Sequence, residues 1–478
     1  MNKLDTKALK QRILTLAMQG KLVNQDPMDE PASELLKQIQ AEKAELVKAK
    51  KIKKQPTLPA VTEDEKPFAI PDSWEWVRLG EISNIGSAKS YSPYDIKQDI
   101  HILELADIES DTGKIINYKV TKDKPKSNKY GYNKGQILFS KLRPYLKKNL
   151  IAPDNGYCTS ELIPFNGINC ENKFLLNVIN SRYVQSIISQ ETSGVNLPRF
   201  NPNKMRLLLI PLPSFNEQRR IADKIDELFE LVDQIEVSQN RYDDLQKALQ
   251  KKVLELAMKG KLVNQDPTDE TASELLKQIQ AEKAELVKAK KIKKQATLPA
   301  VTEDEKPFDI PDSWEWVRLG NLGVWQAGAT PSRKNNLYYE NGSIPWLKTG
   351  DLDDGIIKEV SERITEQALV DTSVKINNPG NILIAMYGAT IGKLGIVGNF
   401  PLTTNQACCG MTPFNGVFNW YVFYWLLNSR KKLIELGSGG AQPNISKDKI
   451  SKFLIPLPSF DEQRRIADKI DEIVGLLS

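Results

Sequence analysis

One stretch of the chain, Gln218 to Met258, is predicted to form a single unbroken helix because neither proline nor glycine interrupts it. Its apolar residues recur at alternating steps of four and three for about five repeats, which is the heptad pattern of a coiled coil. At about 1.5 Å per residue the stripe is about 50 Å long, so it needs a partner to cover it. Its apolar members are Ile221, Ile225, Leu228, Val232, Ile235, Leu249, Val253 and Leu256.

The two ends of the chain repeat the two halves of this helix. Asp461 to Leu476 copies its beginning, the first residues of the chain copy its end, and only about residues 234–240 have no copy. The residues on the stripe are Ile466, Ile470 and Ile473 at one end and Leu9, Ile13 and Leu16 at the other. We therefore expect the two ends to lie end to end against the central helix, as an antiparallel coiled coil with pseudo-twofold symmetry. Two independent amphipathic helices with separate partners are the alternative.

A second repeat covers the residues beside these helices. Residues 17–80 match residues 257–320 with five differences, and an internal repeat of this kind decides the architecture before anything else. In the first copy we predict a helix from Pro31 to Lys54, followed by a polar, proline-rich tether. The helix ends in lysines. These cations either stabilise the helix end through its dipole, contact phosphate or dock a partner subunit. They are Lys48, Lys50, Lys51, Lys53 and Lys54.

Two inserts of mixed character follow the two copies, and each opens with IPDSWEWVRLG and closes with IPLPSF. Short buried strands are predicted at 135–146, 162–167, 380–398 and 411–416, and helices at 174–189 and 420–436. Shared landmarks at a nearly constant shift pair Gly135 with Gly380, Phe165 with Phe414, and Asn180-Ser181-Arg182 with Asn428-Ser429-Arg430. This predicts one α+β fold used twice, with loops that differ.

These patterns divide the chain into five segments. They are a helical region with its tether at 1–67, a first domain at 68–214, a central helical region at 215–307, a second domain at 308–459 and a final helix at 460–478. Because the frame is nearly identical in the two halves and the loops are not, such a protein is suited to binding two different targets at a fixed separation. DNA with two unlike half-sites fits that description.

Charge is unevenly distributed between the inserts. The chain carries a net charge of +5, and residues 68–212 alone hold 19 Lys and Arg against 14 Asp and Glu, whereas residues 308–457 hold 14 against 13. The basic excess of the first insert suits a polyanionic partner. No apolar run has the length of a membrane span and the first residues lack a signal-peptide core, so we expect a cytoplasmic protein with no membrane partner.

Motifs for catalysis or metal binding are missing from the sequence. The segment from Gly388 to Lys393 is one residue short of a phosphate-binding loop, and Leu394 stands where a hydroxyl is needed. The cluster of Asp351, Asp353 and Asp354 is interpreted as a turn, and His101 is the only histidine. The four cysteines show no metal-binding spacing and are interpreted as reduced structural thiols; they are Cys158, Cys170, Cys408 and Cys409.

Candidates for nucleic-acid contact lie in corresponding loops of the inserts. In the first insert they are Lys141, Arg143, Tyr145, Lys147 and Lys148, just after a predicted strand, and Arg199 in a turn. In the second insert they are Tyr387, Thr390 and Lys393, with Gln442 and Asn444 in the matching turn. Long cations contact phosphates, whereas Arg, Asn and Gln also read base edges. Each residue alone could equally be a solvated loop side chain, and the aligned group is the stronger signal.

The joint pattern resembles the specificity subunits of Type I restriction-modification enzymes. It is carried by the EQRRIADKID helices, the WEWVRLG openings, and the segments ILFSKLRPYL, ILIAMYGATIGKLGI and AQPNIS, and it covers essentially the whole chain. The resemblance implies two α/β target-recognition domains, each reading one half of a split target in double-stranded DNA, separated by helices that act as spacer and docking surface.

The resemblance also implies partner subunits. Two modification (M) subunits would carry S-adenosylmethionine and methylate adenine, and restriction (R) subunits would use ATP and Mg to translocate and cleave. The chain itself is then expected to hold no cofactor, no metal and no catalytic residue. A duplicated scaffold that binds proteins through its two heads, without DNA, is the alternative function.

Overall fold

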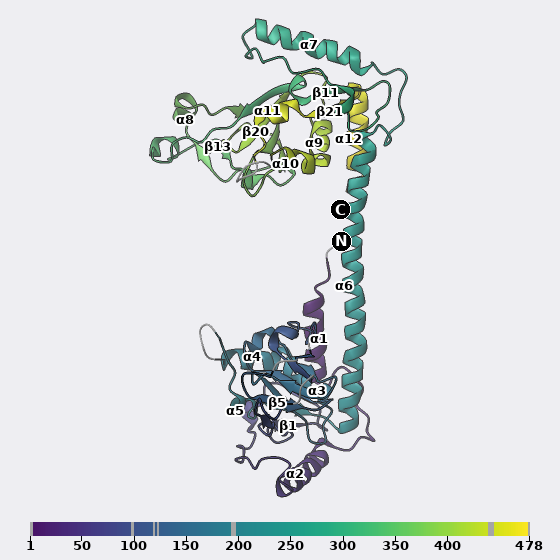
Figure 1. The fold of residues 1–478 in the computed structure, drawn as a ribbon, viewed down its shortest axis with the longest axis vertical. Helices are drawn as coiled ribbons and strands as arrows, with labels where there is room; N and C mark the ends of the chain where they lie inside the picture. The colour runs from purple at the N-terminus through teal and green to yellow at the C-terminus, as the bar shows by residue number, and fades with distance from the viewer. Residues whose placement is uncertain are drawn as a thin grey trace. The chain divides into compact units, whose positions relative to one another are not determined.

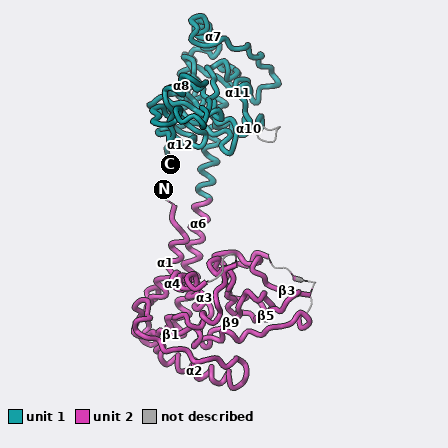
Figure 2. The backbone as a smooth tube through the Cα atoms, turned by 90° about the vertical axis from the view of Figure 1, so that its left-hand side faces the viewer, with its two compact units in different colours: residues 1, 241–478 teal, residues 2–240 magenta. Residues whose placement is uncertain are grey.

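The computed structural model describes residues 3–96, 100–117, 120–121, 124–192, 197–437 and 444–476. The chain forms two compact units, residues 2–240 and residues 241–478, which we call the N-terminal and the C-terminal unit (Figure 2). Each unit combines one copy of the repeated block, one mixed α/β insert and one part of the long helix α6 (Phe215–Met258) (Figure 1). No helix in the described ranges combines the length and the apolar character needed to cross a membrane.

Helix α6 confirms the predicted central helix, and its 44 residues begin three positions earlier than expected. In the N-terminal unit, helix α1 (Thr6–Met18) lies against it. The Thr6 hydroxyl donates to Glu236 at 3.1 Å, and Lys10 forms an ion pair with Asp233. Residue numbers rise along α1 as they fall along α6, so the two helices are antiparallel, as predicted.

The C-terminal unit contains the corresponding pair. Helix α12 (Phe460–Gly475) buries Ile466 and Ile470 in the same cluster as Val253 and Met258 of α6. The stripe is buried or half-buried at both ends of α6, but Ile235 and Leu249 are 38% and 44% exposed. The predicted end-to-end placement of α1 and α12 concerns two separate units and stays a prediction, as do the spacer roles of the stripe residues.

A hydrogen-bonded latch joins each repeated block to the start of a helix. The indole nitrogen of Trp74 and the amide of Gln25 both donate to Glu217 in the first turn of α6, at 2.9 and 2.5 Å. Burial raises the pKa of Glu217, because the carboxylate lies away from water. Next to it, Arg220 holds Asp29 with both guanidinium nitrogens.

The same latch recurs in the C-terminal unit, where Trp314 and Gln265 donate to Glu462, at the start of α12. Burial raises the pKa of Glu462 as well, and Arg465 holds Asp269. The repeated sequence therefore builds the same joint twice.

The helix predicted from Pro31 to Lys54 is shorter than expected. Helix α2 spans Ala32–Lys48, and its copy α7 spans Ala272–Lys288. The backbone of Lys50 turns left-handed, with φ of 55°, and the next amide, that of Lys51, returns to the carbonyl of Leu46 at 2.9 Å. This is the closing pattern of a Schellman motif. Ile52 is then buried in the core, which draws the chain back onto the domain, so the last lysines follow the helix.

The proline-rich tether is held against its domain by one buried arginine. Arg78 is 5% exposed, and its guanidinium donates to the carbonyls of Pro59, Ala60 and Leu207 and to both carboxylate oxygens of Glu65. In the C-terminal unit Arg318 makes the equivalent set of bonds, with Pro299, Ala300, Lys452 and Glu305. The tether is thus a fixed strap in both units.

Each insert begins and ends in one small sheet. Strand β1 (Glu75–Arg78) pairs antiparallel with β10 (Leu209–Leu212), and β11 (Glu315–Arg318) pairs with β21 (Leu454–Leu457) in the same register. The shared opening and closing motifs of the sequence are therefore partners in space.

The other strands form two further sheets in each unit. In the N-terminal unit the first of these sheets has the strand order β2 (Ser90–Tyr91), β5 (Lys129–Tyr132), β8 (Gly156–Cys158), β3 (Ile100–Leu103), β4 (Val120–Thr121). The second has the order β7 (Leu150–Ile151), β6 (Ile137–Ser140), β9 (Leu162–Phe165). In the C-terminal unit the first sheet has the order β12 (Gly323–Ala327), β20 (Cys408–Pro413), β17 (Ile382–Ala385), β18 (Leu394–Val397), β14 (Gly355–Ile357). The second has the order β15 (Arg363–Ile364), β13 (Ile344–Leu347), β19 (Leu402–Thr404), β16 (Ile376–Asn377). Both units contain an equivalent parallel contact, β3 with β8 and β13 with β19, and the C-terminal unit has a second one, β14 with β18.

The remaining helices follow the same order in both inserts. They are α3 (Asn172–Asn180), α4 (Arg182–Gln190) and α5 (Pro202–Met205), against α9 (Asn419–Asn428), α10 (Arg430–Gly437) and α11 (Lys447–Lys452), with α8 (Glu366–Asp371) in the C-terminal unit. Short 3-10 turns lie at Glu63–Glu65, Leu105–Asp107, Pro144–Leu146, Glu303–Glu305, Leu319–Asn321, Asn336–Tyr338 and Thr349–Asp351.

Two details of the predicted correspondence were wrong. Each insert helix is in fact two helices, broken at Ser181 and at Ser429, and Ser181 caps the second one with its hydroxyl. The matched Phe165 and Phe414 are also not equivalent. Phe165 pairs with Ile137 in β6, but the residue that pairs with the equivalent position, Ile382, is Met411. Strand β20 is longer than β9, so the shared PFNG letters fall three residues later.

Candidate nucleic-acid interface

The two candidate segments of the N-terminal unit lie side by side. Strand β6 ends at Ser140, and the loop that follows forms a β-bridge between Leu142 and Arg199. The amide of Arg143 donates to the carbonyl of Pro198 at 2.7 Å, and the amide of Phe200 donates to the carbonyl of Lys141 at 2.9 Å. These backbone bonds join the loop 141–148 and the turn 197–200 into one surface.

The C-terminal unit repeats this geometry. A β-bridge joins Tyr387 to Asn444, and the amide of Ile445 donates to the carbonyl of Met386 at 2.7 Å. Both partners stand 245 positions after their N-terminal counterparts, so the prediction that these two pairs of segments correspond is confirmed. Gln442 lies outside the described residues.

Arg199 is held in a fixed orientation. Its Nε and Nη2 atoms donate to the two carboxylate oxygens of Glu161, each at 3.2 Å, while 47% of the side chain remains exposed. Glu161 precedes β9, so the arginine is braced by the sheet. A fork fixed on one edge keeps its other N–H groups available at the surface, which suits the bidentate reading of a base or a phosphate.

The loop of the N-terminal unit places two cations on a left-handed backbone. Arg143 and Lys147 both have φ of 48°, and their counterparts at the 245 shift are Gly388 and Gly392, with φ of 84° and 79°. A non-glycine residue in this region costs about 1 kcal/mol. Such strain often occurs at functional sites, but Lys50 and Asp354 of this chain adopt the same backbone region in structural turns. Contact with DNA through Arg143 and Lys147 is compatible with this backbone and stays a prediction.

Other candidates differ in how far they are available. Tyr145 is 52% exposed in the short helical turn that follows Arg143. Lys148 instead donates to the carbonyl of Leu105 at 2.7 Å, so its ammonium supports the loop from within. In the C-terminal unit Asn444 is exposed, whereas the last three candidates are half-buried: Tyr387, Thr390 and Lys393.

Two residues that bear on nucleic-acid contact were not predicted from the sequence. Glu161, which orients Arg199, carries no sequence signal because its partner is 38 positions away. In the C-terminal unit Arg333 lies over the rings of Tyr339 and Trp346, at 4.4 and 5.0 Å from their centres, and its side chain is 51% exposed. A stacked, half-exposed arginine of this kind is a further candidate for contact with DNA.

The cysteines and the aspartate cluster, to which the sequence analysis gave no functional role, lie in surroundings that fit a structural role. Burial raises the pKa of three thiols, Cys158, Cys170 and Cys409, to about 12, and it raises that of Cys408 too, so these free thiols are poor nucleophiles. Asp354 has φ of 70°, and its carboxylate accepts from the amide of Leu394 at 2.9 Å and forms an ion pair with Arg430, so this carboxylate has structural partners.

Comparison with known proteins gives a consistent picture. The family described as Type I restriction modification DNA specificity domain matches the chain twice, over residues 71–242 and 311–477. The chain is 33% identical to the Escherichia coli Type I restriction enzyme EcoAI specificity subunit, over 98% of this chain and 89% of that protein. It is 36% identical to the EcoEI specificity subunit of the same organism, over 69% of this chain and 65% of that protein.

Solved structures are similar in fold. A chain from a structural study of complex assembly and conformational transition in the type I R-M system has a TM-score of 0.61 at 24% identity, covering 86% of this chain and 92% of that one. The HsdS subunit from Thermoanaerobacter tengcongensis has a TM-score of 0.55 at 23% identity, covering 86% and 93%.

Proposed function

Because this chain belongs to the specificity subunits of Type I restriction-modification enzymes, the DNA-recognition component of those complexes rather than a catalytic one, we propose how its two units divide the target. The N-terminal unit reads one half-site through Arg143, Tyr145 and Arg199. The C-terminal unit reads the other through Asn444 and the loop 386–393. The observation that carries this division is the pair of equivalent bridges, which present different side chains from the same backbone frame.

The catalytic steps belong to partners in this proposal. Two modification subunits would bind S-adenosylmethionine and methylate adenine, and restriction subunits would use ATP and Mg, all within the cytoplasm. Two modification subunits are favoured because the repeated block and its latch occur twice, so a docking surface built from them also occurs twice. A protein-binding scaffold without DNA is the alternative, and salt-dependent binding of duplex DNA by the complex with M separates the two.

Helix α6 is proposed to set the distance between the half-sites. Deleting residues 232–238 removes one heptad, which keeps the apolar stripe in phase and shortens the helix by about 10 Å. We expect both half-site sequences to stay the same while the gap between them contracts by about three base pairs, at about 3.4 Å each.

The measurement is methylome sequencing of cells that express the variant with its partner subunits. Unchanged spacing between the methylated half-sites would contradict the role of α6. Changed half-site sequences would contradict the division of reading between the two units.

A further inference from the structure

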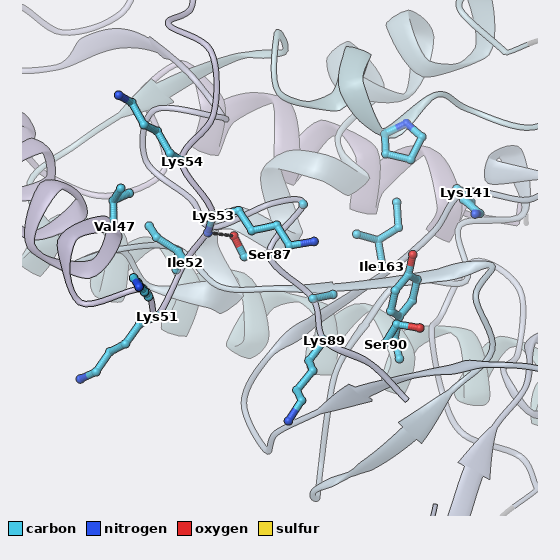
Figure 3. Close-up of a pocket in the computed structure, with 15 residues that line it drawn as sticks. Val47, Lys51, Ile52, Lys53, Lys54, Ser87, Lys89, Ser90, Lys141 and Ile163 are labelled. Carbon is cyan, nitrogen blue, oxygen red and sulfur yellow. Dashed lines mark hydrogen bonds between the residues drawn. The ribbon is translucent and has the colours of Figure 1, made fainter. Parts of the chain in front are cut away.

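A basic groove in the N-terminal unit is not explained by the loops described so far. It has a volume of about 940 Å³ and is lined by the segment after α2, by residues 86–90 and by the residue that follows β6 (Figure 3). Six of its lining residues are lysines: Lys50, Lys51, Lys53, Lys54, Lys89 and Lys141. We propose that this groove binds the sugar-phosphate backbone of duplex DNA beside the half-site read by the N-terminal unit. The proposal rests on the proposed function and extends it to the repeated helical block.

The lysines stand on a backbone that is fixed to the domain. The amide of Lys53 donates to the hydroxyl of Ser87 at 3.2 Å, and the side chain of Gln55 donates to the carbonyl of Ile85 at 2.5 Å. Ile52, which precedes both residues, is buried. In Figure 3 the side chain of Lys53 extends between its own segment and Ile163, whereas Lys51 extends outward. All six lysines line the groove.

None of these lysines forms a close ion pair within the part of the chain that the structure describes, although Lys89 is near enough to Asp95 to help lower the pKa of that carboxyl. Other lysines of this unit pair with carboxylates, as Lys173 does with Asp226 at 2.7 Å and Lys7 with Asp111 at 3.4 Å. None of the six groove lysines has an ion pair of this kind among the described residues. Ammonium groups gathered without close counter-charges favour a polyanion, since binding releases the ions condensed on it.

The position of the groove favours DNA. Lys141 lines it, and the carbonyl of the same residue accepts the bond from Phe200 that joins the two candidate segments. Arg143 and Arg199 are therefore attached to the backbone that borders the groove. A duplex read by these two arginines would place its neighbouring phosphates near the groove. Lysines suit phosphates as point charges, and such contacts fix the register of the protein on DNA without reading sequence.

The asymmetry between the units argues against a docking site for a partner protein. The C-terminal unit has the same lysines after α7, at 290, 291, 293 and 294, but Met386 stands in place of Lys141. The ten residues that follow the second WEWVRLG, 321–330, contain no lysine, whereas Lys89 lies among the ten that follow the first. A surface for two equivalent modification subunits would be complete in both units. This one is complete only where the insert supplies its own lysines.

The test uses the complex of the full chain with its modification subunits. The first variant carries Lys51→Gln, Lys53→Gln and Lys54→Gln, and its matched control carries Lys291→Gln, Lys293→Gln and Lys294→Gln in the C-terminal unit. A second variant carries Lys89→Gln and Lys141→Gln. DNA affinity is measured as a function of salt, on duplexes with and without the target sequence.

We expect the slope of log affinity against log salt to become shallower by about 2.7 in the first variant and by about 1.8 in the second, at about 0.9 for each phosphate that is no longer neutralised. The decrease in affinity should be similar on both duplexes, the methylated sequence should not change, and the control should keep the slope of the unaltered complex. Glutamine keeps the length and polarity of these surface side chains, so the fold should persist.

Three results would overturn the groove proposal. They are an unchanged slope in both variants, an equal decrease in the control, and failure of the first variant to assemble with the modification subunits, which would make the groove a protein-docking surface. If the unaltered complex shows no preference for any target duplex, the proposed function itself fails. That outcome is distinct from a failure of the groove.

Discussion

The loops 141–148 and 386–393 occupy the same place in their units, and each is joined to its turn by an equivalent β-bridge and an equivalent backbone hydrogen bond, yet they present different chemistry. Where one carries Arg143 and Lys147 on a left-handed backbone, the other carries Gly388 and Gly392. The turn opposite differs too, with Arg199 in one unit and Asn444 in the other. The comparison separates what the frame does from what the side chains do: the frame fixes the place of contact, and the loop residues decide what is contacted.

The frame can be tested through its strap arginines, and this is the largest effect we expect. Arg78→Ala should lower the free energy of unfolding of the N-terminal unit by about 3 kcal/mol, because three backbone carbonyls lose a buried, charged donor. Arg318→Ala should cost the C-terminal unit the same amount. Hydrogen exchange measured by mass spectrometry at increasing urea gives the stability of each unit. Unequal losses would show that the two frames are not equivalent.

Replacing Arg199 or Asn444, the residues at the two β-bridges, by alanine should weaken the binding of one half-site each. Arg199→Ala should weaken binding of the N-terminal half-site by about 1 to 3 kcal/mol if the guanidinium reads a base. Asn444→Ala should do so for the other half-site. Binding of the complex to duplexes with one half-site scrambled measures each loss separately. Equal loss at both half-sites for either variant would break the comparison.

The positions with a left-handed backbone allow the effect of a side chain on stability to be separated from its effect on DNA binding. Arg143→Gly should raise the stability of the N-terminal unit by about 0.5 to 1 kcal/mol, because the strain at φ of 48° is relieved. The same variant should weaken binding of DNA, since the guanidinium is gone. A variant that is more stable but binds less well is the expected signature, read by urea unfolding and by DNA affinity. A loss of stability would mean that the arginine serves the fold.

The smallest effect concerns one of the five differences between the repeated blocks. Thr271 caps α7 with its hydroxyl, and Glu274 returns the bond, whereas Pro31 at the start of α2 makes no side-chain cap. Pro31→Thr should therefore stabilise α2 by about 0.5 to 1 kcal/mol. Slower hydrogen exchange in the first turn of α2, approaching that of α7, is the measurement. No change would mean that the cap is worth nothing on a helix already held by its core contacts.

The regular features were accessible from sequence because they follow local rules. The heptad stripe predicted α6, the copied motifs predicted two similar inserts, and the shared spacing predicted that the segments around Arg199 and Asn444 correspond, although not that each is bridged to its loop. Each of these predictions depends on periodicity or on a repeat. None of them needs knowledge of which distant residues meet.

What sequence reasoning missed depends on contacts between distant segments. The helix before Lys50 stops early because Ile52 is drawn into the core, and Arg199 is oriented by a carboxylate 38 positions away. The PFNG letters misled the alignment, since strand register and not letter identity places Phe165 opposite Ile137. The groove could not be predicted because Lys89 joins the block lysines only in the folded unit.

The pairing of β1 with β10, and of β11 with β21, has a consequence for how such proteins can change. Each insert leaves its frame and returns to it through two neighbouring strands with the same register, Glu75 opposite Leu212 and Glu315 opposite Leu457. An insert of this form can be replaced by a different insert between the same two strands without moving the helices of the frame. We therefore expect that exchanging a whole insert between its two bordering strands changes what that unit contacts, while the helices and straps of the frame keep their sequence.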